Sequence, residues 1–171
     1  MFMYHNIQGS DFFMPYNREA ARDYALKWAY GYNPDFYNFD KLGGDCTNFA
    51  SQVLYAGGLP MNYTPTLGWY YISLNDRAPA WTGVNELYRF LTTNTGVGPK
   101  AREVGIDEIQ LADIVQINYG RDQSFDHTPV IVDVGERTPE TILLAAHSCP
   151  AKNRPLSTYD YVDVRFLHII N

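Results

Sequence analysis

One cysteine and two histidines carry the chemistry that this sequence offers. Cys46 lies in the stretch GGDCTNFASQVLYAGG, where a helix is expected to begin. The N-terminus of a helix carries partial positive charge and unpaired backbone N–H groups, which favour a thiolate over a thiol. The same N–H groups can hold the oxyanion that forms when a thiolate attacks a carbonyl. Cys46 is therefore a candidate nucleophile, and its own backbone N–H is expected to form part of the oxyanion hole.

Two of the four histidines lie at the ends of neighbouring apolar segments. His127 opens DHTPVIVDVG, and His147 closes ETILLAAHS. If the chain turns at residues 135–139, the simplest hairpin register sets the two imidazoles side by side on one face. A slip of one residue would put them on opposite faces. In the simplest register, the order Cys46, His127, His147 is typical of a nucleophile, a general base and a group that orients the base.

Each of these residues also has an ordinary structural interpretation. A cysteine that faces inward from a helix is commonly an inert core thiol, and Cys46 could also form a disulfide with Cys149. His127 and His147 could each be satisfied core histidines. The same three side chains are also of the types that hold zinc with an open fourth position, although the short spacing of common zinc motifs is missing. The residue types alone leave these alternatives open.

Three helices are expected before residue 100, each between a capping residue and a glycine stop. They lie between Asn17 and Gly31, over residues 46–56, and between Thr82 and Gly96. Asp45 is interpreted as the cap of the second helix rather than as a catalytic acid. After residue 100, segments rich in Val, Ile, Leu and Tyr predict strands at 109–119, 128–134, 141–147 and 161–170. Helices followed by adjacent strands indicate an α+β fold with an antiparallel sheet.

The segment 59–80 combines prolines with little periodicity, which predicts a long ordered loop. Long loops in compact domains are often binding loops. Its cluster Trp69, Tyr70 and Tyr71 is therefore a candidate wall of a substrate groove. Aromatic residues make up 15% of the chain, and the alternative is that these rings build the core.

Composition and charge exclude several classes of protein. The formal charge of −6 argues against a nucleic-acid binder, which needs a basic face. No run of about 18 apolar residues is present, so no membrane span is expected. The first residues lack the basic and apolar regions of a secretory signal. With 171 residues, we expect a single domain over 1–171, with residues 1–15 as an N-terminal arm.

Six blocks of sequence, in order, carry a resemblance to a known family. They are DCTNFASQVLYAGG, WYY, AWTGVNELYRFL, LADIVQINY followed by DHTPVIV, AAHS, and NRPLSTY with RFLHI. Together they resemble the putative amidase domain family of bacteria, which is similar to the NlpC-type and CHAP cell-wall peptidases. The match runs from about Asn17 to the C-terminus. The resemblance implies a papain-like core within the α+β class.

The resemblance also implies a cysteine hydrolase that needs no cofactor. The cysteine of the DCTNF block corresponds to Cys46 and the histidine of the DH(S/T) block to His127, while His147 holds the place of the polar residue that completes the triad. The implied substrate is an amide of a peptide or of peptidoglycan. The implied location is secreted or cell-wall associated, although no signal peptide is present in this chain. The segment HSCPAKNRPLSTY departs from the family, whose members often carry acidic residues there.

Two other functions remain open. One is a non-catalytic module on the same fold that binds cell-wall glycan or protein through its aromatic residues. The other is a zinc hydrolase that uses Cys46, His127 and His147 as ligands.

Overall fold

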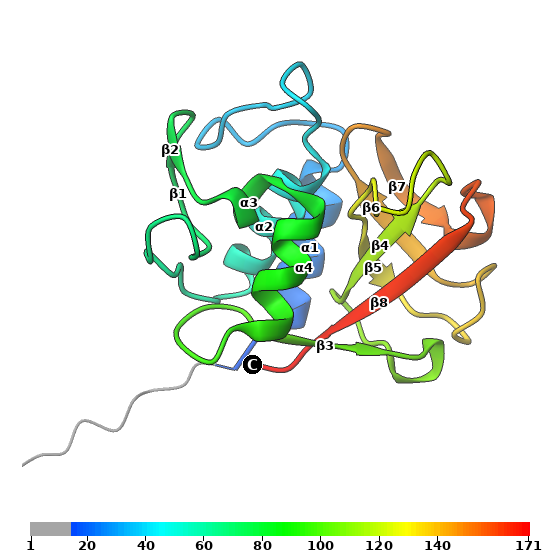
Figure 1. Ribbon diagram of the computed structural model, residues 1–171. Helices are drawn as coiled ribbons and strands as arrows, with labels where there is room; N and C mark the ends of the chain where they lie inside the picture. Colours follow the sequence, from blue (N-terminus) through cyan, green and yellow to red (C-terminus); the bar gives the residue numbers. More distant parts are fainter. Residues whose placement is uncertain (1–14) are drawn as a thin grey trace, which may run out of the picture.

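A layer of helices packs against one face of an antiparallel sheet in the computed structural model, which describes residues 15–171 (Figure 1). The helices are α1 (Arg18–Trp28), α2 (Cys46–Ala56), α3 (Pro79–Thr82) and α4 (Val84–Thr93). Apart from residue 15, the predicted N-terminal arm lies outside the described residues. Within residues 15–171, every helix is too short or too polar to span a bilayer.

The six-stranded sheet has the order β3-β8-β4-β5-β6-β7, and all of its neighbouring pairs are antiparallel. Its strands are β3 (Ala101–Val104), β4 (Ile114–Asn118), β5 (Val130–Asp133), β6 (Leu143–Ala146), β7 (Ala151–Pro155) and β8 (Asp163–Ile169). The short strands β1 (Tyr71–Ser73) and β2 (Asp76–Arg77) form a separate hairpin inside the predicted long loop. Single 3-10 turns lie at η1 (Ile106–Glu108) and η2 (Leu156–Thr158). The predicted α+β class with an antiparallel sheet is confirmed.

Local sequence signals explain most of the helix boundaries. The side chain of Asn17 accepts a hydrogen bond from the backbone N–H of Ala20 at 3.0 Å, so it caps α1 as predicted. Helix α2 covers the predicted residues 46–56. The third predicted helix corresponds to α4, which follows the extended Gly83 and ends at Thr93. The short helix α3 lies before it and was not predicted.

The sheet is apolar on both faces, and each face belongs to a different cluster of buried side chains. The first cluster joins the helices to the sheet and includes Phe49 and Val53 of α2 together with Val130 of β5. The second cluster covers the opposite face and includes Ile131 of β5 and Tyr159. Strand β5 therefore buries alternate side chains on both sides.

The predicted register of the β5–β6 hairpin is wrong by one residue. The observed pairs are Val130 with Ala145 and Ile131 with Leu144, followed by an irregularity before Asp133. Because both faces of β5 and β6 are buried, the alternation of apolar residues does not select one register.

This slip separates the two histidines. His127 precedes β5 and forms an isolated bridge with Ile117 of β4, while His147 directly follows β6. The rings that contact His127 belong to or pack on the second cluster, whereas His147 packs on Phe49 of the first cluster. The two imidazoles therefore lie on opposite faces of the sheet, as expected for a shift of one residue.

Candidate active site

The Cys46 side chain lies where the N-terminus of α2 meets the start of the sheet. It is the first residue of the helix and is 7% exposed. Its sulfur lies 3.8 Å from the hydroxyl of Thr47, which in turn lies 3.0 Å from the hydroxyl of Thr128. The backbone of Thr128 also hydrogen-bonds the thiol. The contact between Thr47 and Thr128 thus joins the first turn of α2 to the segment that carries His127.

Burial raises the pKa of the Cys46 thiol, and the contacts with Thr128 and Thr47 oppose this rise only in part. The nearby carboxylate of Asp45 raises the pKa further. Burial therefore favours the thiol over the thiolate that the helix end was expected to produce. The helix N-terminus is present, but the loss of water around the sulfur outweighs it.

The His127 imidazole is buried and neutral. Its side chain is 3% exposed, and burial lowers its pKa from 6.5 to about 4, with a smaller contribution from the positive charge of Arg154. Its Nε2 atom is enclosed and has no hydrogen-bond partner among the residues that the structure describes. A neutral imidazole is the form that can accept a proton.

Cys46 and His127 share a neighbourhood, although His127 Nε2 makes no hydrogen bond to the thiol in this state. The thiol contacts the backbone of Thr128, which is bonded directly to His127. The ring of Tyr119 also lies beside that of His127, with the centroids 6.1 Å apart, and burial raises the pKa of Tyr119 to about 12. A thiol and a neutral imidazole in this arrangement can act as a nucleophile and its general base.

His147 has other partners than the predicted ones. Its Nδ1 lies 2.6 Å from Oδ2 of Asp45, and its Nε2 lies 2.8 Å from the carbonyl oxygen of Trp28. Its ring stacks on Phe49 of α2, with the centroids 4.2 Å apart. Since both ring nitrogens are occupied and the ring lies on the other face of the sheet, His147 does not orient His127 here. This corrects the role predicted from the hairpin register.

The Asp45 side chain links the segments around the start of α2 by hydrogen bonds and does not cap the helix. It occupies the N-cap position, but its side chain makes no capping hydrogen bond. Its Oδ1 instead accepts from the backbone N–H of Phe39 at 2.7 Å and from the amide of Asn48 at 2.9 Å. With His147 on Oδ2, one buried carboxylate joins the preceding loop, the first helical turn and the end of β6.

Of the three aromatic residues predicted to line a groove, Trp69 lies in the core. Trp69 is fully buried, its indole N–H donates to the Ser51 hydroxyl at 2.9 Å, and its ring lies 4.7 Å from that of Trp81. The prediction that Trp69 lines a groove is therefore wrong. Tyr70 is half-buried and packs against Tyr63, with the ring centroids 5.5 Å apart.

Tyr71 does line a hollow, of about 430 Å³, beside α2. Tyr24, Gln52 and Asp35 also face this hollow. The Gln52 oxygen accepts from the Tyr24 hydroxyl at 2.7 Å, which fixes the orientation of the Gln52 amide. The hollow therefore combines ring faces with a fixed amide and a carboxylate.

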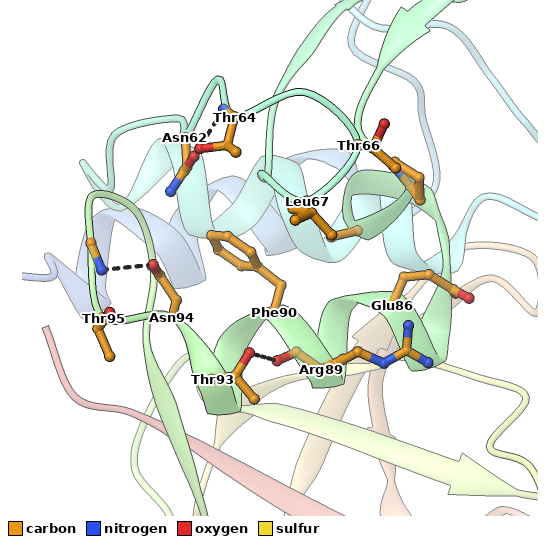
Figure 2. Close-up of a pocket in the computed structure, with 13 residues that line it drawn as sticks. Asn62, Thr64, Thr66, Leu67, Glu86, Arg89, Phe90, Thr93, Asn94 and Thr95 are labelled. Atoms are coloured by element: carbon orange, nitrogen blue, oxygen red, sulfur yellow. Dashed lines mark hydrogen bonds between the residues drawn. The ribbon is translucent and has the colours of Figure 1, made fainter.

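A larger hollow of about 640 Å³ lies between α4 and the segment 62–67 (Figure 2). Phe90, Glu86 and Arg89 of α4 line one side of it, and Leu67 lines the other. None of the three predicted catalytic residues borders this space.

Two of the structural alternatives can be examined directly. Cys46 and Cys149 are both free thiols, the first buried and the second exposed, so the alternative disulfide is not formed. Within residues 15–171, no three His, Cys, Asp or Glu side chains lie close enough together to hold a metal ion. His127 and His147 lie on opposite faces of the sheet and so do not meet at Cys46.

Sequence reasoning missed the rings that enclose His127. Tyr159 lies on one side of the imidazole with its centroid 6.1 Å away, and the guanidinium carbon of Arg154 lies 3.8 Å from the centre of the Tyr159 ring. Both residues fall in the block NRPLSTY, which the resemblance singled out without giving it a role. No spacing rule connects them to His127, because the contact is made across the sheet.

Comparison with known proteins identifies the family. Two proteins of Bacillus subtilis (strain 168), both described as uncharacterized, are similar to this chain. YhbB is 32% identical over 119 residues, which cover 68% of this chain and 37% of YhbB. YjcM is 26% identical over 148 residues, which cover 82% of this chain and 32% of YjcM. The chain thus spans about a third of the length of these curated relatives.

No solved structure matches this chain, so the papain-like core implied by the resemblance has no structural counterpart in the comparison. A family model described as "Putative amidase domain" matches residues 15–170. This match covers nearly the whole chain and includes Cys46, His127 and Tyr159. The chain therefore belongs to the putative amidase domain family.

Proposed function

We propose that this domain is a cysteine hydrolase that cleaves the C–N bond of an amide, with Cys46 as nucleophile and His127 as general base. The observation that carries the proposal is the position of Cys46. Its thiol lies at the first turn of α2 and contacts the backbone of Thr128, the residue next to His127. Membership of the amidase family agrees with this chemistry.

The two pKa shifts keep both groups neutral before the attack and oppose proton transfer in the resting state, so the proton moves only as the bond to sulfur forms. A raised pKa for Cys46 and a pKa of about 4 for His127 give a neutral thiol beside a neutral imidazole at neutral pH. As Sγ bonds to the carbonyl carbon, its proton passes to the imidazole of His127. The backbone N–H of Cys46, which has no partner within the helix, helps to hold the negative oxygen.

The remaining steps return the enzyme to its starting state. His127 gives its proton to the leaving nitrogen as the C–N bond breaks, which leaves a thioester on Cys46. Water then attacks the thioester carbonyl, and His127 accepts a proton from this water. The proton passes to the sulfur as the C–S bond breaks, and a carboxylic acid is released. Acyl transfer through a thioester in this way requires no cofactor.

The proposed substrate is an amide in a peptide or in peptidoglycan, by analogy with the family. The hollow beside Tyr71 is the proposed place for a part of the substrate remote from the scissile bond. Its ring faces and the fixed amide of Gln52 suit a ligand that has both apolar and hydrogen-bonding surface.

The test is amine release from peptide amides and from purified peptidoglycan, compared for the wild type, Cys46→Ala, His127→Gln and the control Cys149→Ser. We expect Cys46→Ala and His127→Gln to abolish release and Cys149→Ser to preserve it. Intact-mass measurement after a short reaction should detect an acyl group on the wild type but not on Cys46→Ala. Equal activity of Cys46→Ala and wild type would refute the cysteine mechanism.

The burial of Cys46 and His127 favours a non-catalytic binding module as the second candidate. That function predicts binding to purified cell wall that is unchanged in Cys46→Ala, without amine release by any of the four proteins. A zinc hydrolase would instead contain stoichiometric metal by elemental analysis after purification without chelator.

A further inference from the structure

We propose that Tyr159 is a positioning residue: the two rings turn so that its hydroxyl oxygen accepts a hydrogen bond, not formed in this structure, from Nε2 of His127. This bond holds Nδ1 toward Cys46. This inference rests on the proposed function and gives His127 the orienting partner that His147 does not provide.

The first observation is that two neighbouring rings each carry an enclosed polar atom without a hydrogen bond. Among the described residues, only His127 Nε2 and the Tyr159 hydroxyl are enclosed side-chain nitrogen or oxygen atoms without a hydrogen bond of good geometry. The Arg154 guanidinium lies close enough to the Tyr159 hydroxyl to lower the pKa of Tyr159, which partly offsets the effect of burial. The two enclosed atoms belong to adjacent rings, whose centroids are 6.1 Å apart and whose planes meet at 36°. An unpaired buried polar group costs about 1–3 kcal/mol. A hydrogen bond between these two atoms would remove both costs at once.

The second observation is the protonation state of each ring. A neutral imidazole carries its proton on one nitrogen, and a hydrogen bond at that nitrogen selects the tautomer. A general base must turn its lone pair toward the thiol, so the other nitrogen must carry the proton and find an acceptor. Burial raises the pKa of Tyr159 to about 12, so its hydroxyl is neutral and retains lone pairs that can accept. Tyr159 as acceptor at Nε2 therefore gives His127 the tautomer that the proposed reaction needs.

The third observation is that the Tyr159 ring is held in place by other contacts. Arg154 lies over the ring, and its guanidinium donates to the carbonyl of Thr158 at 2.7 Å and to the hydroxyl of Thr158 at 2.9 Å. The Tyr159 backbone N–H donates to the carbonyl of Leu156 at 3.1 Å, which closes the turn η2. A ring fixed in this way can restrain its neighbour without a direct role in bond making.

The test is Tyr159→Phe, which removes only the hydroxyl, with Tyr161→Phe as the matched control. Tyr161 lies two residues away and packs on the same cluster. With any amide that the wild type cleaves, we expect Tyr159→Phe to lower kcat about 10- to 100-fold with little change in KM, as expected for loss of about one hydrogen bond in the transition state. The free energy of unfolding should fall, because the variant leaves the enclosed Nε2–H of His127 without its acceptor. Tyr161→Phe should retain wild-type kcat.

A second measurement does not depend on catalysis. The ¹⁵N chemical shifts of His127 at pH 7 should indicate a proton on Nε2 in the wild type and a mixture of tautomers in Tyr159→Phe. Unchanged kcat together with unchanged ¹⁵N shifts in Tyr159→Phe would overturn the inference. If the wild type hydrolyses no amide, the proposed function fails, while the ¹⁵N shifts still decide whether the two side chains pair.

Discussion

The burial of His127 predicts that the protein loses stability in mild acid. Its pKa is about 4 in the folded protein and 6.5 for an unperturbed histidine. Between these values the unfolded chain binds a proton at this position and the folded chain does not, so unfolding becomes more favourable as the pH falls. At 1.36 kcal/mol per pH unit, the difference is worth about 3 kcal/mol. The contribution is fully present above pH 6.5, declines as the pH falls, and is lost by about pH 4.

The assay is urea unfolding of the wild type and of His127→Gln at half-unit steps from pH 8 to pH 4. Groups common to both proteins cancel in the difference between the two curves, which isolates His127. We expect the stability advantage of the wild type over the variant to shrink by about 3 kcal/mol between pH 7 and pH 4. A constant difference over this range would show that the His127 pKa is ordinary, and a growing difference would show that burial favours the charged form. Either result would refute the reasoning.

Three further predictions concern other parts of the site. Iodoacetamide should modify the exposed Cys149 before Cys46 at every pH from 6 to 9, because burial keeps Cys46 in the thiol form. Peptide mass spectrometry would follow the modification of each cysteine. Faster reaction of Cys46 at pH 6 would contradict this prediction. Asp45→Ala should lower the free energy of unfolding by about 3–5 kcal/mol in urea, because it leaves His147 and two N–H donors without their buried acceptor; a loss below 1 kcal/mol would argue against the network. Trp69→Ala should lower the free energy of unfolding by about 3–5 kcal/mol in the same assay, as for other large buried rings. An unchanged free energy of unfolding together with weaker substrate binding would instead support the predicted role of Trp69 in a groove.

The elements that carry Cys46 could be predicted because their signals are local. Helix α2 lies between Asp45 and a pair of glycines, and its observed bounds are those expected from the sequence. The cap of α1 by Asn17 follows equally from one side chain and the first helical turn. Such signals depend on neighbours in the chain, so they are visible before the chain is folded.

The relation between the two histidines could not be predicted, because it depends on a single residue of register. Val130, Ile131 and Val132 are all buried, so the alternation of side chains gives no preference for either face. Strand β7, with the sequence AKNRP, escaped prediction because it is an edge strand rich in polar residues. These features depend on which strands meet across the sheet.

The inward orientation of Trp69 was missed for a similar reason. Trp69 and Asn62 form an isolated antiparallel bridge within the predicted loop, and the indole N–H reaches Ser51 on α2. Adjacent aromatic residues in a loop look alike in sequence whether they build the core or face a ligand. The difference arises here from one bridge and one buried hydrogen bond.

The carboxylate of Asp45 explains why the two histidines have different tasks. A buried negative charge beside the first turn of α2 opposes formation of a second negative charge on Cys46, and Asp45 indeed contributes to the raised pKa of the thiol. The same carboxylate is hydrogen-bonded to Phe39, Asn48 and His147 and so holds the helix end in place, while burial is the main cause of the raised pKa of Cys46. A nucleophile that remains a thiol must lose its proton during the attack, which makes a neutral and correctly oriented base more important than it would be for a stable thiolate. His147 belongs to the rigid support of the helix, and the proton chemistry is left to His127.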